Sequence, residues 1–285
     1  RNNSFEAGTE WRFFKNRLSL DATVYEQTTI DQILYAPVEY ASGYSSSLIN
    51  MGKVVNKGVE LTLNGNPVKN YAGFSWDVTV NWSMNRNKVL ELNNETGSVI
   101  LAKYVGSRVT VEAREGQPLG TIYGLGFKRS PEGQIVFDKD GYPVLTDQFV
   151  NLGNTNPDWR GSISNNFKYK NWSLSVLLDI RQGGRIFSLT NSILGEQGKN
   201  TATLAGRYDG IIGEGVTLNA DGQYVPNTTK ATNIVTYYNK WYGRDNVEAN
   251  TFDASFVKLR EARLAYTIPA KIFSFNSHLK NDIIH

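Results

Sequence analysis

The clearest candidates for chemistry are two carboxylates at alternate positions before a glycine, Asp138 and Asp140 ahead of Gly141. Calcium takes about six to eight oxygen ligands, and calcium loops place carboxylates at such alternate positions. A glycine-containing hairpin turn explains the same residues, because aspartate side chains accept hydrogen bonds from nearby backbone in turns. Even with Asp147 as a third carboxylate the set is small. The turn is therefore the favoured interpretation, and Asp138 and Asp140 remain weak metal candidates.

The other reactive side chains do not form a catalytic set. The two histidines, His278 and His285, stand close to the end of the sequence, so a histidine-dependent triad or a histidine-rich metal site is not expected. Glu112 and Glu115 have the residue type of a glycosidase pair, but solvated loop charge is the simpler explanation. Cysteine is absent, which excludes disulfides, thiol chemistry and thiolate metal sites. We therefore expect neither an enzyme nor a bound cofactor.

Aromatic side chains in the long polar segments are better candidates for contact with a ligand. Flat aromatic faces stack on sugars and peptides, and Tyr and Trp are enriched among the residues that dominate binding. The alternative is that these rings pack the loops against one another, and for any single residue this alternative is favoured. The residues predicted to make contact are Tyr44, Tyr123, Tyr237, Tyr238 and Trp241.

These segments must be held by strands, and residues 73–83 show the strand pattern most clearly. Alternate residues are apolar from Phe74 to Trp82, and the residues between them are polar. Because strand side chains alternate between two faces, one face is apolar and the other polar. A strand of about 9–11 residues with an apolar band and aromatic ends has the length that crosses an outer membrane. The side chains predicted to face lipid are Trp76, Val78, Val80, Trp82, Trp172, Leu174, Val176 and Leu178.

The strands are joined alternately by short turns and long segments. Strands are expected at 5–14, 17–30, 57–66, 74–83, 160–169, 172–182 and 255–267, with a weak last strand after Phe275. In the strand at 255–267 the apolar parity changes between Leu259 and Ala262, which predicts a β-bulge. The long segments are 31–56, 84–159 and 183–254, all on one side. Outer-membrane barrels have this asymmetry, with short periplasmic turns and long external loops.

Two other interpretations stay open. Alternating strands also build soluble β-sandwiches, here one that would bind glycans, and a small outer-membrane barrel acting as an adhesin would show the same hairpins. Loops of about 25–75 residues on one side favour the membrane, because most connections in soluble domains have about 4–6 residues. The sequence contains no apolar run of about 18 residues, so no membrane-spanning helix is expected. Formal net charge is +3, from 30 basic and 27 acidic residues, and predicts no affinity for nucleic acid.

Four segments, in this order, resemble signatures of the SusC/RagA family of TonB-dependent outer-membrane transporters. The first runs from Asn50 to Leu61 and contains Asn56-Lys57-Gly58. The others are Arg114-Glu115-Gly116-Gln117-Pro118-Leu119-Gly120-Thr121-Ile122-Tyr123-Gly124, Leu152-Gly153-Asn154-Thr155-Asn156-Pro157-Asp158-Trp159, and Phe252-Asp253-Ala254-Ser255-Phe256-Val257-Lys258-Leu259-Arg260 followed by Tyr266-Thr267-Ile268-Pro269. The acidic loop common in the family is shortened here to Asp138-Lys139-Asp140-Gly141.

The resemblance implies a barrel of about 22 strands with an N-terminal plug, driven by TonB in the outer membrane of a Gram-negative, Bacteroidetes-like cell. It also implies a SusD-like surface lipoprotein as lid and import of glycans or peptides, so the five aromatic residues become candidates for ligand or lid contact. We expect residues 1–285 to be a C-terminal part of the barrel, without plug, earlier strands or final strands. The fold class is then all-β: an antiparallel up-and-down transmembrane barrel, here partial, open and curved, of about eight long strands. Arg181-Gln182-Gly183-Gly184-Arg185 lacks phosphate-loop spacing, and its glycines are expected to let the strand leave the barrel rim.

Overall fold

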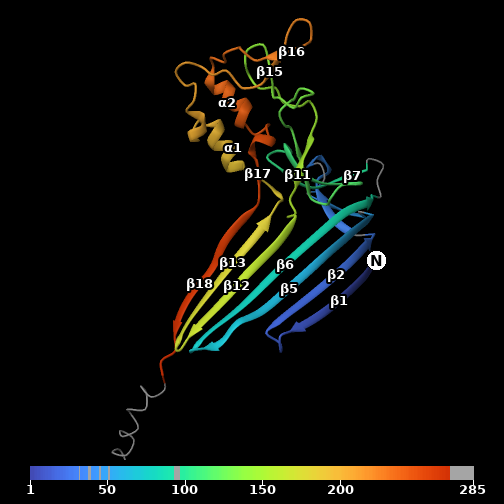
Figure 1. Cartoon of the computed structure of the whole chain (residues 1–285). Coiled ribbons are helices and arrows are strands. Elements are labelled where there is room, and N and C mark those ends of the chain that lie inside the picture. The colour runs from blue at the N-terminus through green and yellow to red at the C-terminus, as the bar shows by residue number, and fades with distance from the viewer. Residues whose placement is uncertain (32, 38–39, 45, 51, 93–96, 270–285) are drawn as a thin grey trace, which may run out of the picture.

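One large antiparallel sheet dominates the protein. The computed structural model describes residues 1–269 apart from 32, 38–39, 45, 51 and 93–96. Seven strands lie in the sheet in chain order, so each strand pairs with the one before it and the one after it, as in an up-and-down barrel wall (Figure 1). They are β1 (Asn2–Phe13), β2 (Leu18–Ile30), β5 (Lys53–Tyr71), β6 (Phe74–Glu91), β12 (Trp159–Tyr169), β13 (Trp172–Gln182) and β18 (Phe256–Tyr266).

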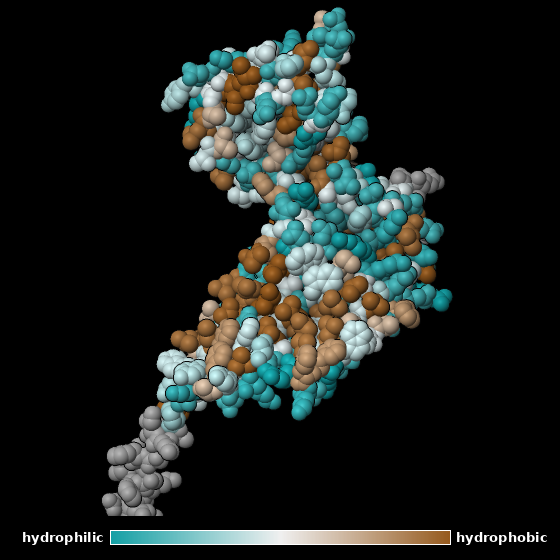
Figure 2. Space-filling view, in the orientation of Figure 1, coloured by the Kyte–Doolittle hydropathy of each residue, from teal (hydrophilic) through white to brown (hydrophobic). Residues whose placement is uncertain are grey.

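The register places the apolar residues of neighbouring strands side by side on one face. Leu61 pairs with Ala22 of β2 and with Trp82 of β6, and Ile163 pairs with Val80 and Leu178. The apolar face is open: several of its large side chains, for example Val257 at 69%, remain exposed. Figure 2 shows hydrophobic residues gathered over this face of the sheet. The alternation predicted from the sequence therefore extends across the whole sheet as a single surface.

The predicted bulge in β18 is confirmed. Leu178 pairs with Leu259 and the preceding Leu177 pairs with Glu261, so Arg260 has no partner of its own across the strands. The extra residue returns the side chains on both sides of the bulge to the same face. Arg260 turns to the polar face, where its guanidinium donates to Oδ2 of Asp179 at 2.6 and 2.8 Å.

The short turns all lie at one end of the sheet, and the long segments at the other (Figure 1). The hairpins turn at 14–17, 72–73 and 170–171, close to the predicted positions. Non-glycine residues there adopt positive φ, among them Lys15 at 56°, Ala72 at 51° and Lys170 at 51°. This left-handed conformation fits the two-residue turns whose twist matches that of paired strands. The weak strand predicted after Phe275 lies outside the described residues.

The predicted boundaries of β5 and β6 were wrong at the loop end. The sequence predicted strands at 57–66 and 74–83, but β5 begins at Lys53 and β6 continues to Glu91. At the turn end β5 also continues past the predicted end, to Tyr71. Beyond Trp82 the alternation of apolar and polar residues ends, because loop residues cover the sheet there. Val54 and Val89 are instead fully buried against Leu92 and Ala113 of the loops. The main sheet thus extends past its apolar band into the loop region.

The long segments contain secondary structure of their own. A hairpin fills part of 31–56, a four-stranded sheet in the order β11-β9-β8-β7 fills much of 84–159, and two helices lie in 183–254. The strands are β3 (Ile33–Pro37), β4 (Ser46–Asn50), β7 (Ser98–Tyr104), β8 (Val109–Arg114), β9 (Thr121–Gly124), β10 (Val136–Phe137), β11 (Val150–Asn154), β14 (Arg185–Phe187), β15 (Val216–Leu218), β16 (Tyr224–Pro226) and β17 (Thr251–Asp253). The helices are α1 (Leu189–Glu196) and α2 (Ile234–Tyr242), with short 3₁₀ turns η1 (Tyr40–Ser42), η2 (Thr201–Thr203) and η3 (Glu248–Asn250).

Helix α2 has local sequence signals that differ from the strand pattern. Asn233 caps it, because its side chain accepts a hydrogen bond from the backbone N–H of Thr236 at 3.0 Å. Ile234, Tyr237, Tyr238 and Trp241 then follow at helical spacing and face one side. That side packs against Phe137 and Ala231. The cap and the spacing could have predicted this helix.

The buried cores lie at the loop end and not within the main sheet. Three clusters of buried residues form there, centred on Val89, Phe137 and Val109. Among the described residues no second sheet covers the apolar face, which a β-sandwich requires. No described helix is long and apolar enough to span a membrane.

Candidate functional site

The polar face of the main sheet carries a ladder of hydrogen bonds between neighbouring strands. Thr62 donates to Asn81 at 3.0 Å, and the Asn81 amide donates to Ser162 at 3.2 Å. Thr79 and Asn64 are joined across β5 and β6 at 2.8 Å. These short polar groups leave the face hydrophilic without large charges. A closed barrel would present such a surface to its lumen.

Gly58 of the first signature lies beneath the ring of Tyr25. A Cβ at Gly58 would stand 2.3–2.6 Å from three atoms of that ring, so glycine is required for the ring to cross β5. The Tyr25 hydroxyl then reaches β6 and donates to Asn85 Oδ1 at 3.3 Å. Beside it, Lys57 forms an ion pair with Glu26 at 3.0 Å. The signature therefore joins three neighbouring strands close to the loop end.

The second and third signatures also meet at the loop end of the main sheet, which we call the rim. Asn154 and Asn156 both donate their side-chain amides to the carbonyl of Leu119, at 3.0 and 2.9 Å. Leu119 in turn donates its backbone N–H to Asn87 of β6 at 2.6 Å. Gly120, at φ +87°, allows the chain to turn there. Two segments far apart in the sequence are thus held against the end of β6.

The fourth signature closes this rim on the other side. Gly183 and Gly184 have φ values of +75° and +84° directly after β13 ends, so the predicted role of these glycines in leaving the rim is confirmed. The Gly183 N–H donates to Ser255 Oγ at 2.7 Å, and Asp253 accepts from the Ser255 N–H at 2.7 Å. Hydrogen bonds from the side chain and the backbone of Ser255 lower the pKa of Asp253 below its usual value. The second, third and fourth signatures therefore fix the loops to the wall, while the first joins strands of the wall to one another.

Two of the three long segments, 84–159 and 183–254, pack on each other through α2. Tyr237 and Tyr238 are only 3% and 6% exposed, and Trp241 packs beside Phe127 with ring centroids 4.8 Å apart. Burial raises the pKa of Tyr237 to about 12, because the anionic form would lose its hydration. This arrangement supports the packing alternative for these rings.

The other predicted contact residues lie apart from α2. Tyr123 is 4% exposed, and the Arg114 guanidinium covers its ring at 3.6 Å from the centroid. Tyr44 is 73% exposed. The structure therefore does not bring the five predicted residues together into one site, and ligand contact by each of them stays a prediction.

Carboxylates that the sequence analysis singled out serve the loops. Asp138 Oδ1 accepts the backbone N–H groups of Asp140 and Tyr142 at 3.0 and 2.9 Å, which is the geometry of the predicted turn. Its other oxygen contacts Lys240 Nζ at 3.3 Å. Glu112 is buried and paired with Arg114. Among the described residues no group of three or more metal-binding side chains comes together.

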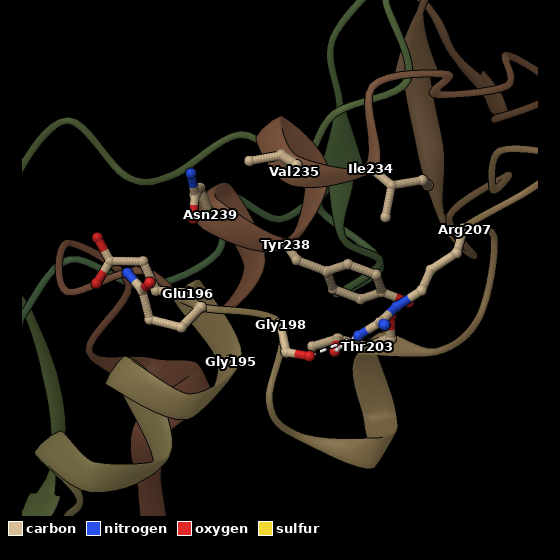
Figure 3. A pocket seen from close by; sticks show the side chains of 10 residues that line it. Gly195, Glu196, Gly198, Thr203, Arg207, Ile234, Val235, Tyr238 and Asn239 are labelled. Atoms are coloured by element: carbon tan, nitrogen blue, oxygen red, sulfur yellow. Dashed lines mark hydrogen bonds between the residues drawn. The ribbon is translucent and has the colours of Figure 1, made fainter.

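A cavity of about 590 Å³ lies between the end of α1 and the start of α2 (Figure 3). This volume falls within the range of about 300–1,000 Å³ typical of small-molecule sites. Arg207 forms one wall and is held by the carbonyls of Thr203 and Gly198 at 2.9 and 2.5 Å. Tyr238 is fixed by its hydroxyl, which donates to the carbonyl of Ala205 at 2.9 Å. Sequence reasoning identified Tyr238 but missed the remaining lining residues, which are Gly195, Glu196, Gln197, Gly198, Thr203, Arg207, Ile234, Val235 and Asn239.

The cavity combines two kinds of surface. Glu196, Gln197 and Asn239 offer charged and amide groups, while Ile234 and Val235 offer apolar ones. Glu196 is oriented by Arg244, whose Nε lies 3.1 Å away. A site of this composition can hydrogen-bond hydroxyl or amide groups of a ligand and pack against its apolar side.

Comparison with known proteins gives a consistent result. Residues 1–122 match the family described as TonB dependent receptor-like, beta-barrel. TonB-dependent receptor P3 of Formosa agariphila is 25% identical over 286 residues, which cover 93% of this chain and 27% of that protein. TonB-dependent receptor P39 of the same organism is 30% identical over 207 residues, covering 70% and 18%. The chain therefore spans about a quarter or less of the length of these relatives.

Solved structures with the same fold are also found. The RagAB peptide transporter matches with a TM-score of 0.66 at 20% identity, over 96% of this chain and 30% of that one. The RagAB peptide importer in its closed-closed state matches with a TM-score of 0.67 at 20% identity, over 97% and 30%. At this identity the likeness establishes the fold alone. It agrees with the main sheet, whose seven strands are arranged in chain order.

Proposed function

We propose that this chain, whose residues 1–122 match the TonB dependent receptor-like β-barrel family, forms part of the wall and outer loops of an outer-membrane nutrient importer. In this proposal residues 1–285 are a C-terminal part of the barrel, and the plug that TonB acts on belongs to another part of the receptor. The imported molecules are oligosaccharides or peptides, received together with a SusD-like surface lipoprotein. The protein works by transport and not by catalysis.

The observation that carries this proposal is the single sheet with one apolar face, one polar face and all its long loops at one end. An open apolar face of this size is unfavourable in water but matches the hydrocarbon of a membrane. The outer strands β1 and β18 have free edges among the described residues. Further strands of the barrel would satisfy these edges, because no unpaired backbone is tolerated in lipid.

The outer loops supply the candidate contact region. The cavity between α1 and α2 lies at the loop end, away from the apolar band of the sheet (Figure 1). Its amide, guanidinium and aliphatic groups suit the mixed polar and apolar surface of a sugar or a short peptide. We propose that ligand meets the receptor there before it reaches the polar face of the wall. Tyr44, which is exposed, is a further candidate for contact with ligand or lid.

Arginine substitutions at neighbouring positions of β12 test the membrane placement in the complete receptor. Ile163 pairs with Val80 and Leu178 on the apolar face, and Ser164 pairs with Thr79 and Leu177 with its own side chain on the polar face. Ile163→Arg is expected to cost about 2–4 kcal/mol of barrel stability, because arginine would face hydrocarbon. Ser164→Arg, at nearly the same depth, is the matched control and should change stability far less.

The readout is the fraction of heat-modifiable, folded barrel in isolated outer membranes. Equal effects of the two substitutions, or a wild-type protein that stays monodisperse without detergent, would reject the membrane placement. Uptake of labelled oligosaccharide and peptide pools by cells with and without the receptor then tests import. A receptor that inserts but supports no uptake of either pool would reject the transport function while keeping the placement.

A further inference from the structure

Charge is segregated at the turn end of the sheet. The segments 11–20, 66–76 and 167–173 form the three short hairpin ends and contain six basic residues and no acidic residue. The whole chain is nearly balanced, with 30 basic and 27 acidic residues. Net charge alone therefore does not produce this cluster. The basic residues are Arg12, Lys15, Arg17, Lys69, Lys168 and Lys170.

The three turns touch each other, so these charges form one band. The backbone N–H of Lys170 donates to the carbonyl of Gly73 in the next turn at 3.0 Å. Arg17 donates to the carbonyls of Asn66 and Pro67 at 3.1 and 2.6 Å, which joins the first hairpin to the second. The turn end consequently presents a continuous edge.

Within this band the lysines lack acidic partners. Lys15, Lys69 and Lys170 are exposed, and none forms an ion pair with a described carboxylate. At the loop end the pattern differs: Lys57, for example, pairs with Glu26 at 3.0 Å. Unpaired, clustered cations repel one another, so an anionic partner would relieve that repulsion.

Aromatic rings border the same edge on the apolar face. Trp76 and Phe167 stack with centroids 5.8 Å apart, and Trp172 contacts Tyr266 at 4.8 Å. Lys170 places its ammonium 5.3 Å from the centre of the Tyr169 ring, on the side where the apolar residues lie. Figure 2 shows a hydrophilic margin below the hydrophobic band at this end. Tyr and Trp occupy the interface between hydrocarbon and headgroups, so cations beside them lie at headgroup depth.

We propose that the turn end binds anionic phospholipid headgroups of the periplasmic leaflet through Lys15, Lys69 and Lys170. This inference rests on the proposed membrane placement, in which short turns face the periplasm. Each lysine near an anionic surface strengthens binding about fivefold at low ionic strength. Lys168 lies on the polar face by register and is directed toward the lumen, so it is not part of the lipid site.

The test uses the complete receptor in phosphatidylcholine vesicles that contain spin-labelled phosphatidylglycerol or spin-labelled phosphatidylcholine. The electron paramagnetic resonance signal of motionally restricted lipid gives the relative association constant of the two lipids. Wild-type receptor should prefer phosphatidylglycerol several-fold. In a triple variant with Lys15→Gln, Lys69→Gln and Lys170→Gln this preference should disappear, because the charges that attract the anionic lipid are removed. The preference should also vanish near 1 M salt, where the screening length is about 3 Å.

The matched control removes the same charge at the loop end. Lys139→Gln, Lys199→Gln and Lys230→Gln alter exposed lysines that form no ion pair with a described carboxylate. The control should keep the wild-type preference. Equal loss in both triple variants, no loss in the turn variant, or a wild-type preference independent of salt would overturn the lipid site.

Folding is checked by heat-modifiable mobility, and the single variant Lys170→Gln together with the wild-type salt titration decides the matter if the triple variant does not fold. A wild-type receptor that fails to enter vesicles overturns the membrane placement and this inference together. One that enters without lipid preference overturns this inference alone.

Discussion

The contact between Gly58 and Tyr25 predicts that Gly58→Ala destabilises the protein when Tyr25 is present and stabilises it when Tyr25 is replaced by alanine. Gly58→Ala would place a Cβ 2.3 Å from the Tyr25 ring, so the ring must leave its position over β5. This removes the Tyr25–Asn85 hydrogen bond, worth about 1 kcal/mol, and a cross-strand aromatic contact worth about 0.2–1 kcal/mol. Alanine in a strand regains about 0.5–1 kcal/mol over glycine. We expect a net loss of about 1 kcal/mol.

In a Tyr25→Ala background the same substitution should become stabilising. The ring and its hydrogen bond are already absent there, so only the gain of about 0.5–1 kcal/mol from replacing glycine remains. The double-mutant cycle should therefore give a coupling free energy of about 1–2 kcal/mol between the two positions. Gly65→Ala in the same strand is the control, because its nearest neighbour would be a Val78 methyl at 3.3 Å.

The assay is equilibrium unfolding of the complete barrel by urea in short-chain lipid bilayers, with tryptophan fluorescence as the signal. A sign reversal between the two backgrounds supports the assigned role of Gly58. If Gly58→Ala changes the free energy of unfolding equally in both backgrounds, the glycine is not required by Tyr25, and our account of the first signature is wrong.

Three further predictions concern the loops. Gly183→Ala should make the loops susceptible to limited proteolysis, because its Cβ would clash with Asp158 Oδ2 at 2.2 Å and its left-handed backbone would cost about 1–2 kcal/mol more. The control is Gly133→Ala, at φ +86° with open space around it, which should show only the backbone cost. The free energy of unfolding should fall as pH rises from about 10 to about 12, because neutral Tyr237 is buried, its pKa is raised to about 12, and the unfolded chain loses this proton first. In Tyr237→Phe this fall should be less steep, with tyrosinate absorbance recording the titration, and an unchanged slope would contradict the burial argument. Calcium or a chelator should leave the melting temperature unchanged, because Asp138 already accepts two backbone N–H groups; a calcium-dependent increase would revive the metal site.

The strands of the wall could be predicted because their pattern is local. A period of two in a half-buried strand records which face each side chain takes, and the parity change near Arg260 recorded the bulge as well. The same method failed for the ends of β5 and β6, which continue beyond the apolar band. There the faces are covered by loops distant in sequence, so the residues show no alternation that marks a strand.

The candidate site was less predictable than the wall. Tyr238 was predicted as a contact residue of the long loops, but its neighbours in the cavity come from α1, α2 and the segment between them. Sequence spacing does not show which loops meet, because that depends on packing between segments separated by many residues. Similarly, the sequence favoured loop packing for each aromatic without showing which of them are buried, and the structure buries Tyr237 and Tyr123 but leaves Tyr44 exposed.

The sequence by itself determined the two-faced strands, the alternation of short turns with long loops, and through its signatures the family. It could do so because strand pattern and turn chemistry are properties of neighbouring residues. Only the tertiary structure showed that the signatures lie together at the loop end of the sheet, that Gly58 leaves the space occupied by the Tyr25 ring, and that contacts between the three turns place their lysines along one edge. Those relations arise from strand register and loop packing, which bring together residues that no local pattern connects.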